Sequence, residues 1–200
     1  MAKIEKLQRN YEVISHFISN KNLISMREKV LVSYRKYSAK VEALLQQLNK
    51  LPQDVLNRSP KQSGWSPLQT AWHLLLVEEI SFQYIQKKMH YGGDFFKPGL
   101  STRLKNIMLH ISLNLPIKFK TPSRVSGENL PQEGNFDELK ERWEKIQSDW
   151  IDFFEKVPEE LLDKAVYKHP RISKIGWLDM IAFFKAHFKR HLRQINRALR

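Results

Sequence analysis

Apolar residues recur at intervals of three and four along most of the chain, the period at which an α-helix buries one face. The clearest stripe predicts a helix over residues 26–48, with Lys, Arg, Glu and Gln on the opposite face. Its apolar members are Val30, Tyr34, Tyr37, Val41, Leu44, Leu45 and Leu48. Glycine is scarce, and the alternation of apolar and polar residues that predicts β-strands is rare. The pattern therefore predicts an all-α protein.

Start signals and apolar spacing predict three more long helices. Ser66 is a favourable N-cap, and Pro67 suits the first helical turn, where a missing N–H costs nothing. Together they predict a helix over 67–90. Apolar residues at core-facing spacing predict two further helices, over 135–156 and 177–199.

The region 94–134, between the second and third of these helices, contains four prolines. It is predicted to be a long crossover with at most a short helix over 101–113. One further turn is predicted over 158–163, and residues 165–170 are expected to be extended or loop-like. Four main helices with one long crossover connection predict a four-helix bundle.

The chain has 200 residues, 42% of them hydrophobic, which suffices for one sizeable core, so we expect a single domain over 1–200. Residues 1–24 are expected to form an N-terminal extension. Apolar spacing there favours an extra helix over 4–18 that packs on the bundle or on a partner subunit, and the sequence leaves that choice open. Neither a membrane-spanning run nor a signal-peptide core is found, so we expect a soluble, cytoplasmic protein.

The chain contains no cysteine, which excludes disulfides, thiolate metal ligands and a protein-borne thiol nucleophile. Its formal net charge is +13, which directs attention to nucleic acid, anionic membrane surfaces and acidic small molecules as partners. The positive charges are spread along the chain, and their densest stretch, 185–200, suits a solvated helix face. No helix-turn-helix, RNA-binding sheet motif or dense basic stripe is evident, so nucleic-acid binding is disfavoured.

Two of the seven histidines, His187 and His191, are separated by one helical turn and lie about 40° apart around the axis, so both project from one face. Such a pair also arises by chance, in which case one histidine is hydrogen-bonded in the core and the other is solvated. His73, two turns inside the predicted second helix, can supply a third imidazole. Three neutral imidazoles suit a divalent ion such as Zn²⁺ or Ni²⁺ and leave one coordination position open.

These histidines stand in motifs that resemble the DinB-like superfamily, which includes bacillithiol transferases. The motifs are Gly64-Trp65-Ser66-Pro67-Leu68-Gln69-Thr70-Ala71-Trp72-His73-Leu74 with Glu78 beyond it, His169-Pro170, and His187-Phe188-Lys189-Arg190-His191-Leu192-Arg193-Gln194-Ile195. The resemblance covers about residues 25–200. It implies a four-helix bundle that holds one divalent metal ion through His73, His187 and His191, and it favours a homodimer.

For the transferase members, the resemblance implies that a low-molecular-weight thiol binds the metal, loses its proton and attacks an electrophile. We therefore predict a metal-dependent S-transferase that acts on a small thiol, with Lys185, Arg190 and Arg193 as candidate contacts for substrate carboxylates. Two alternatives stay open. One is a metal-dependent hydrolase that uses a metal-bound water, and the other is a non-enzymatic binding protein, nucleic acid being one partner to test.

Glu78 follows His73 by five residues, which places it about 140° around the helix. It does not share the face of the histidine. Support of an imidazole N–H by this carboxylate is one interpretation, and a structural or solvated role is favoured over it. His16, His90 and His110 have no partner at ligand spacing and are assigned no function. His169, in a loop before Pro170, can approach the metal end of the bundle, but an ordinary loop histidine is favoured. The five tryptophans are expected to serve packing.

Overall fold

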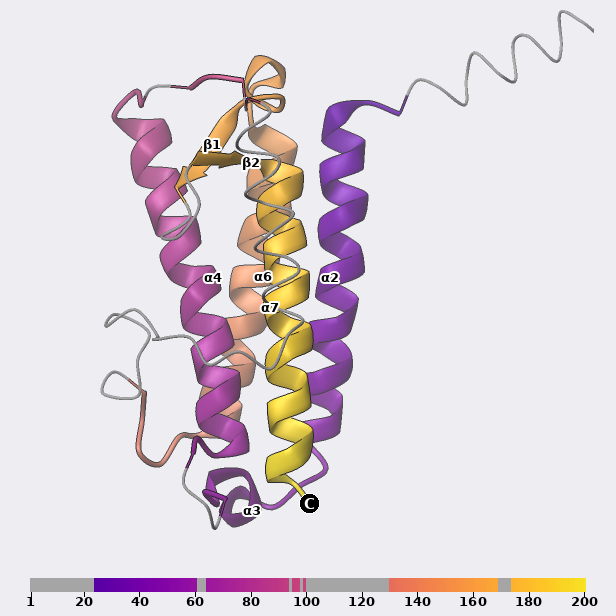
Figure 1. Ribbon diagram of the computed structural model, residues 1–200, viewed down its shortest axis with the longest axis vertical. Helices are drawn as coiled ribbons and strands as arrows, with labels where there is room; N and C mark the ends of the chain where they lie inside the picture. The colour runs from indigo at the N-terminus through magenta and orange to yellow at the C-terminus, as the bar shows by residue number, and fades with distance from the viewer. Residues whose placement is uncertain (1–23, 61–63, 94, 98, 100–129, 169–173) are drawn as a thin grey trace, which may run out of the picture.

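The computed structural model describes residues 24–60, 64–93, 95–97, 99, 130–168 and 174–200. Four long helices lie side by side along a common direction and form the bundle in Figure 1. They are α2 (Met26–Leu48), α4 (Pro67–His90), α6 (Phe136–Lys156) and α7 (Trp177–Ala198). The predicted all-α four-helix bundle is confirmed, and the predicted helix boundaries agree with the observed ones to within about one residue. None of the helices described is both long and apolar enough to cross a membrane.

The start of α4 is fixed by a reciprocal pair of hydrogen bonds at Ser66, the N-cap that the sequence predicts. The Ser66 hydroxyl accepts from the Gln69 backbone N–H at 3.0 Å, and the Gln69 side-chain oxygen accepts from the Ser66 N–H at 3.0 Å. This capping box satisfies two of the N–H groups that a helix leaves unpaired at its start. It fixes where α4 begins, so that His73 lies two turns inside the helix.

Each helix packs against two neighbours: α4 against α6 and α7, and α2 against α6 and α7. In Figure 1, α4 and α6 rise together while α2 and α7 descend. Because α4 and α6 run in the same direction, the connection between them has to return along the length of the bundle, about 36 Å for a helix of 24 residues. This geometry accounts for the long crossover that the prolines of 94–134 predict.

Short elements close the two ends of the bundle. Strands β1 (Ala165–Lys168) and β2 (Lys174–Gly176) pair antiparallel before α7, so the expected extended segment forms half of a small hairpin. A 3₁₀ turn at Glu159–Leu161 matches the predicted single turn. The expected helices over 4–18 and 101–113 lie outside the described residues.

The sequence pattern did not indicate the short helix α3 (Gln53–Asn57), because five residues are fewer than helical periodicity needs to show itself. Asn57 donates to the Gly134 carbonyl at 3.1 Å and accepts from the Gly134 N–H at 2.9 Å. Gln53 donates to the same carbonyl. Helix α3 therefore anchors the chain where it enters α6.

A buried carboxylate, that of Glu78 on α4, joins three of the four helices. Glu78 is 1% exposed and accepts hydrogen bonds from Tyr34 and Tyr37 of α2 and from Trp143 and Gln147 of α6. The indole N–H lies 2.8 Å and the amide nitrogen 2.7 Å from carboxylate oxygens. Each oxygen accepts two of the four donors, so every lone pair of the group has a partner.

Burial also makes the charge of Glu78 costly. Desolvation raises the pKa of the Glu78 carboxyl from its ordinary 4.5 to about 7, against the four hydrogen bonds, which lower it. Between these two pH values the folded protein keeps a proton that the unfolded chain has released. The stabilisation is thus complete below about pH 4.5 and is lost as the pH rises through about 7.

We expect the free energy of unfolding of the metal-free protein to fall between pH 4.5 and 7, by up to roughly 3 kcal/mol from this one group. Glu78→Gln should remove this part of the pH dependence, since an amide does not titrate. Urea unfolding followed by circular dichroism, with a chelator present, measures the slope. Glu79→Gln is the control, because Glu79 directly follows Glu78 in sequence but is half-buried and paired with Arg142. Equal slopes for wild type and Glu78→Gln would contradict the assignment.

Candidate metal centre

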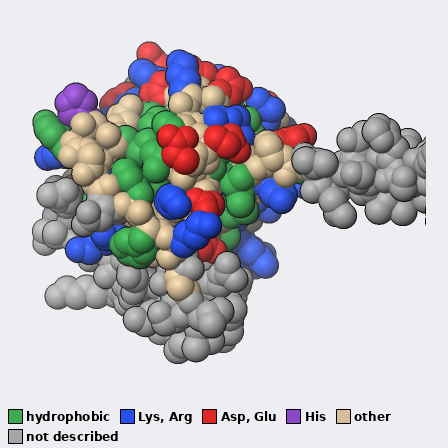
Figure 2. Space-filling model, turned by 90° about the horizontal axis from the view of Figure 1, so that it is seen from above, with side chains coloured by type: hydrophobic (Ala, Val, Ile, Leu, Met, Phe, Trp, Pro, Cys, Tyr) green, Lys and Arg blue, Asp and Glu red, His purple; other side chains and the backbone are tan. Residues whose placement is uncertain are grey.

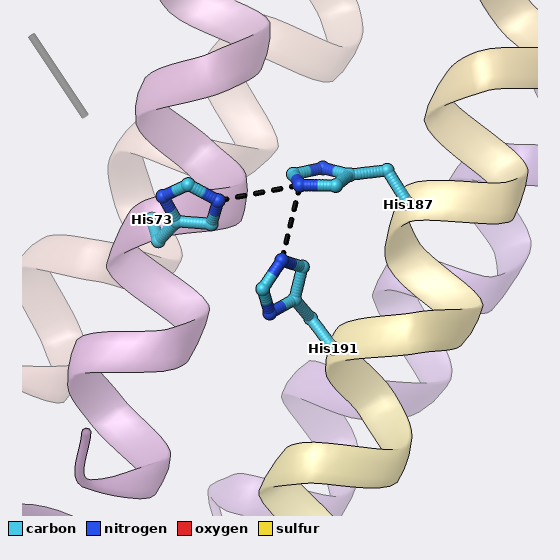
Figure 3. A group of neighbouring side chains, drawn as sticks. All are labelled: His73, His187 and His191. Atoms are coloured by element: carbon cyan, nitrogen blue, oxygen red, sulfur yellow. Dashed lines mark hydrogen bonds between the residues drawn. The ribbon is translucent and has the colours of Figure 1, made fainter. Parts of the chain in front are cut away.

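Three imidazoles meet in the seam between α4 and α7. His73 projects from α4, and His187 and His191 project side by side from α7 (Figure 3). The Nε2 atom of His187 lies 3.3 Å from Nε2 of His73 and 3.0 Å from Nε2 of His191. One ring nitrogen from each of the three lies within 4.8 Å of the others. The structure thus brings together the three histidines that the sequence singles out.

The convergence of these nitrogens matches the requirements of a divalent ion. In a tetrahedral zinc site with Zn–N distances of about 2.0–2.1 Å, neighbouring ligand nitrogens lie about 3.3 Å apart. The two observed Nε2 separations are close to this value. A proton on Nε2 of His187 can serve only one of its two neighbours at a time, whereas a cation between the rings serves all three lone pairs. The donor set fits a borderline divalent metal.

His191 is prepared for this role by its own helix. Its Nδ1 lies 3.0 Å from the side-chain oxygen of Gln194, three residues further along α7. An amide oxygen only accepts, so Nδ1 carries the proton and Nε2 presents its lone pair to the cluster. Burial lowers the pKa of His191 to about 3, aided by repulsion from His73 and Arg190. The imidazole is therefore neutral near pH 7, the form that binds a metal.

Two aromatic side chains flank the cluster. The half-buried Trp65 ring lies 4.9 Å from the His73 ring and 6.4 Å, nearly parallel, from the His191 ring. Phe183 stacks on His187 at 5.3 Å, one turn earlier on α7. Sequence reasoning assigned the tryptophans to packing alone and did not single out Phe183 or Gln194. Phe183 precedes His187 by four residues and Gln194 follows His191 by three, and this helical spacing was the signal that could have identified both as neighbours of the histidines.

The three cationic residues predicted to bind substrate lie at different places. Lys185 donates to the Ser33 hydroxyl of α2 at 2.8 Å, so the structure turns it toward α2 and does not bring it to the imidazoles. Arg190 lies near enough to His191 for its charge to lower the pKa of that ring. Arg193 is exposed and follows His191 by two residues, about 200° around the helix. Arg190 is the best placed of the three.

Glu78 lies about 7.5 Å further along α4 than His73. It bonds to α2 and α6, whereas the interpretation considered from the sequence was support of an imidazole N–H. Its carboxylate oxygens accept from α2 and α6, as described above. These bonds correspond to the structural role that the sequence favours. The Nδ1–H of His191 is instead partnered by the Gln194 side chain.

A helical bundle with three imidazoles converging between facing helices is the architecture in which metal sites of bundle proteins are built. The family model of the DinB superfamily matches residues 37–195, and the chain belongs to this superfamily. The matched range includes all three histidines and Trp65. The resemblance stated from the sequence motifs is thereby confirmed. No curated protein and no solved structure matches the chain.

We expect Gln194→Met, which keeps the length and helix propensity of the side chain, to weaken binding of a divalent ion about 10- to 100-fold. The methionine offers no oxygen to hold the Nδ1 proton of His191, so the ring loses its orientation and tautomer. Competition titration with a metal-chelating dye measures the affinity. Asn196→Met is the matched control, since Asn196 is exposed and bonds Gln47 of α2. An affinity unchanged by Gln194→Met would contradict the role of this side chain.

Proposed function

We propose that this protein binds one divalent metal ion through His73, His187 and His191 and uses it as an S-transferase for a low-molecular-weight thiol. The observation that carries the metal site is the convergence of the Nε2 atoms from two helices. The neutral state of His191 and its fixed tautomer support the same conclusion. Zn²⁺ and Ni²⁺ are the ions that we favour, because both accept a set of three imidazoles.

The proposed thiol chemistry rests on the coordination position that three histidine ligands leave open and on the absence of cysteine from the chain. A site with three protein ligands keeps a position for an exogenous ligand. The chain has no cysteine, so a sulfur nucleophile has to come from the substrate. A divalent cation held by the three histidines would lower the pKa of a substrate thiol, so that the thiol would react as a thiolate near neutral pH. The new bond joins sulfur to the electrophilic carbon, the leaving group departs with its electron pair, and the thiol proton passes to solvent.

Side chains around the imidazoles have separate tasks in this proposal. Gln194 orients His191. Trp65 and Phe183 cover the rings of His73, His191 and His187 with apolar surface, which limits the access of water. The charge of Arg190 lowers the pKa of His191, so its guanidinium lies near the cluster. We assign this guanidinium to binding a carboxylate of the thiol substrate.

A metal-dependent hydrolase is the second candidate, and the open coordination position supports it equally, because water can take the place of the thiol. Dependence of turnover on thiol separates the two reactions. The homodimer, the cytoplasmic location and a single domain over 1–200 remain predictions of the sequence. They are proposed here alongside the activity, and the family model itself covers 37–195.

We expect the protein, purified without an affinity tag, to contain close to one equivalent of a divalent metal by elemental mass spectrometry. The double variant His187→Ala, His191→Ala should lose it, because one imidazole from α4 does not hold an ion alone. His90→Ala is the matched control, since His90 is exposed at the end of α4. A wild-type protein that carries no metal and takes up neither Zn²⁺ nor Ni²⁺ on titration would overturn the proposed site.

We expect product formation from a chromogenic aryl halide to require both the metal-loaded protein and an added thiol. Arg190→Gln should lower kcat/KM for mercaptoacetate by about tenfold and leave that for uncharged 2-mercaptoethanol nearly unchanged, because only the former has a carboxylate to lose a charged partner. Absorbance of the released thioether measures the rates. Thiol-independent hydrolysis of activated esters would favour the hydrolase, and equal losses for both thiols would remove Arg190 from the substrate site.

A further inference from the structure

A row of lysines lies apart from the imidazoles, along the outer seam where α2 and α7 run side by side. Two hydrogen bonds link this parallel pair: Lys185 to Ser33 at 2.8 Å and Gln47 to Asn196 at 3.3 Å. Five lysines follow the seam, and we call them the lysine stripe: Lys29, Lys36, Lys40, Lys185 and Lys189. All but Lys185, which is half-buried, are exposed.

Helical geometry explains why these residues share one side. On α2, Lys29, Lys36 and Lys40 stand four residues before and three and seven residues after Ser33, so they lie on the same face as this contact to α7. On α7, Lys189 follows Lys185 by one turn. The stripe extends about 16 Å from Lys29 to Lys40 along the bundle axis.

The stripe has a single sign of charge. Glu42 follows Lys40 by two residues, about 200° around α2, and so faces away from the seam. Within the described ranges, none of the five lysines forms an ion pair. The helix α6 differs, because its Lys140 and Lys145 pair with Glu144 and Asp149 one turn further on. The end of the bundle seen in Figure 2 likewise mixes basic and acidic side chains.

The ammonium groups are close enough to act on one another. The pKa of the Lys185 side chain is lowered, chiefly by burial and further by repulsion from Lys40 and Lys36. Two helices separated by well over a hundred residues thus hold like charges together, and no carboxylate of the described residues pairs with them. An external anion with several charges in a row would relieve this repulsion.

We propose that the lysine stripe of α2 and α7 binds the phosphate backbone of double-stranded nucleic acid without reading its sequence. A row of cations on straight, packed helices complements a row of phosphates. The exposed aromatic residues of the described chain, Tyr91 and Phe96, lie at the end of α4 and beyond it, so the seam has no platform on which bases of a single strand stack. The sequence alone disfavours such binding because its positive charges are scattered until the fold aligns them.

The test is fluorescence anisotropy of a labelled duplex of mixed sequence with the full-length protein, at several salt concentrations between about 50 and 200 mM. We expect affinity to fall with salt with a logarithmic slope of about −4 to −5, the value for five phosphate contacts. The variant Lys36→Gln, Lys40→Gln, Lys189→Gln should reduce that slope by about three and weaken binding at least tenfold. Circular dichroism confirms that the variant stays helical.

The matched control is Lys140→Gln, Lys145→Gln, Lys156→Gln, which removes the same net charge from α6. This α6 variant should bind the duplex like wild type. The metal-site variant His187→Ala, His191→Ala should also bind it like wild type, because duplex binding does not depend on the proposed enzyme activity. Equal losses in both lysine variants would show that only the overall charge matters and would overturn the stripe. Absence of duplex binding at low salt, or binding to phosphatidylserine vesicles in place of the duplex, would overturn it as well.

Discussion

The antiparallel packing of α4 on α7 is the contact on which the candidate metal centre depends. It buries His73 to 3% exposure and places its Nε2 atom opposite that of His187. The capping box at Ser66 fixes where α4 begins, two turns before His73. A one-residue change in the register of α4 against α7 would rotate His73 by about 100° and remove it from the cluster. The geometry of the centre thus depends on how side-chain packing orients α4 against α7.

The opposite side of α4 is held by polar contacts instead of metal ligands. Glu78 receives donors from both α2 and α6, and a buried carboxylate with all four positions filled tolerates little displacement of its partners. Such a group specifies one alignment of the helices more strictly than apolar contacts of similar area do. We regard it as the feature that keeps the bundle in register, at the cost of a charge that burial disfavours.

Local patterns were sufficient for the four long helices, for the N-cap of α4 and for the choice of His73, His187 and His191. These features depend on spacings within a few turns of one helix. The helix α3 was missed because it is short. The contact between Lys185 and Ser33, the donors around Glu78 and the lysine stripe were not foreseen, because they depend on how α2 aligns with distant helices. That alignment is a property of side-chain packing, and periodicity within a single helix does not reveal it.

The order of the helices also bears on how the centre comes into being. His73 and His187 are 114 positions apart, and they become neighbours only when α7, the last helix, docks on α4. Contacts of such long sequence separation form late and slowly in folding, since a large loop has to close first. The unfolded chain offers a metal at most the local pair on one helix. An ion bound in the completed centre would therefore slow unfolding far more than it would speed folding.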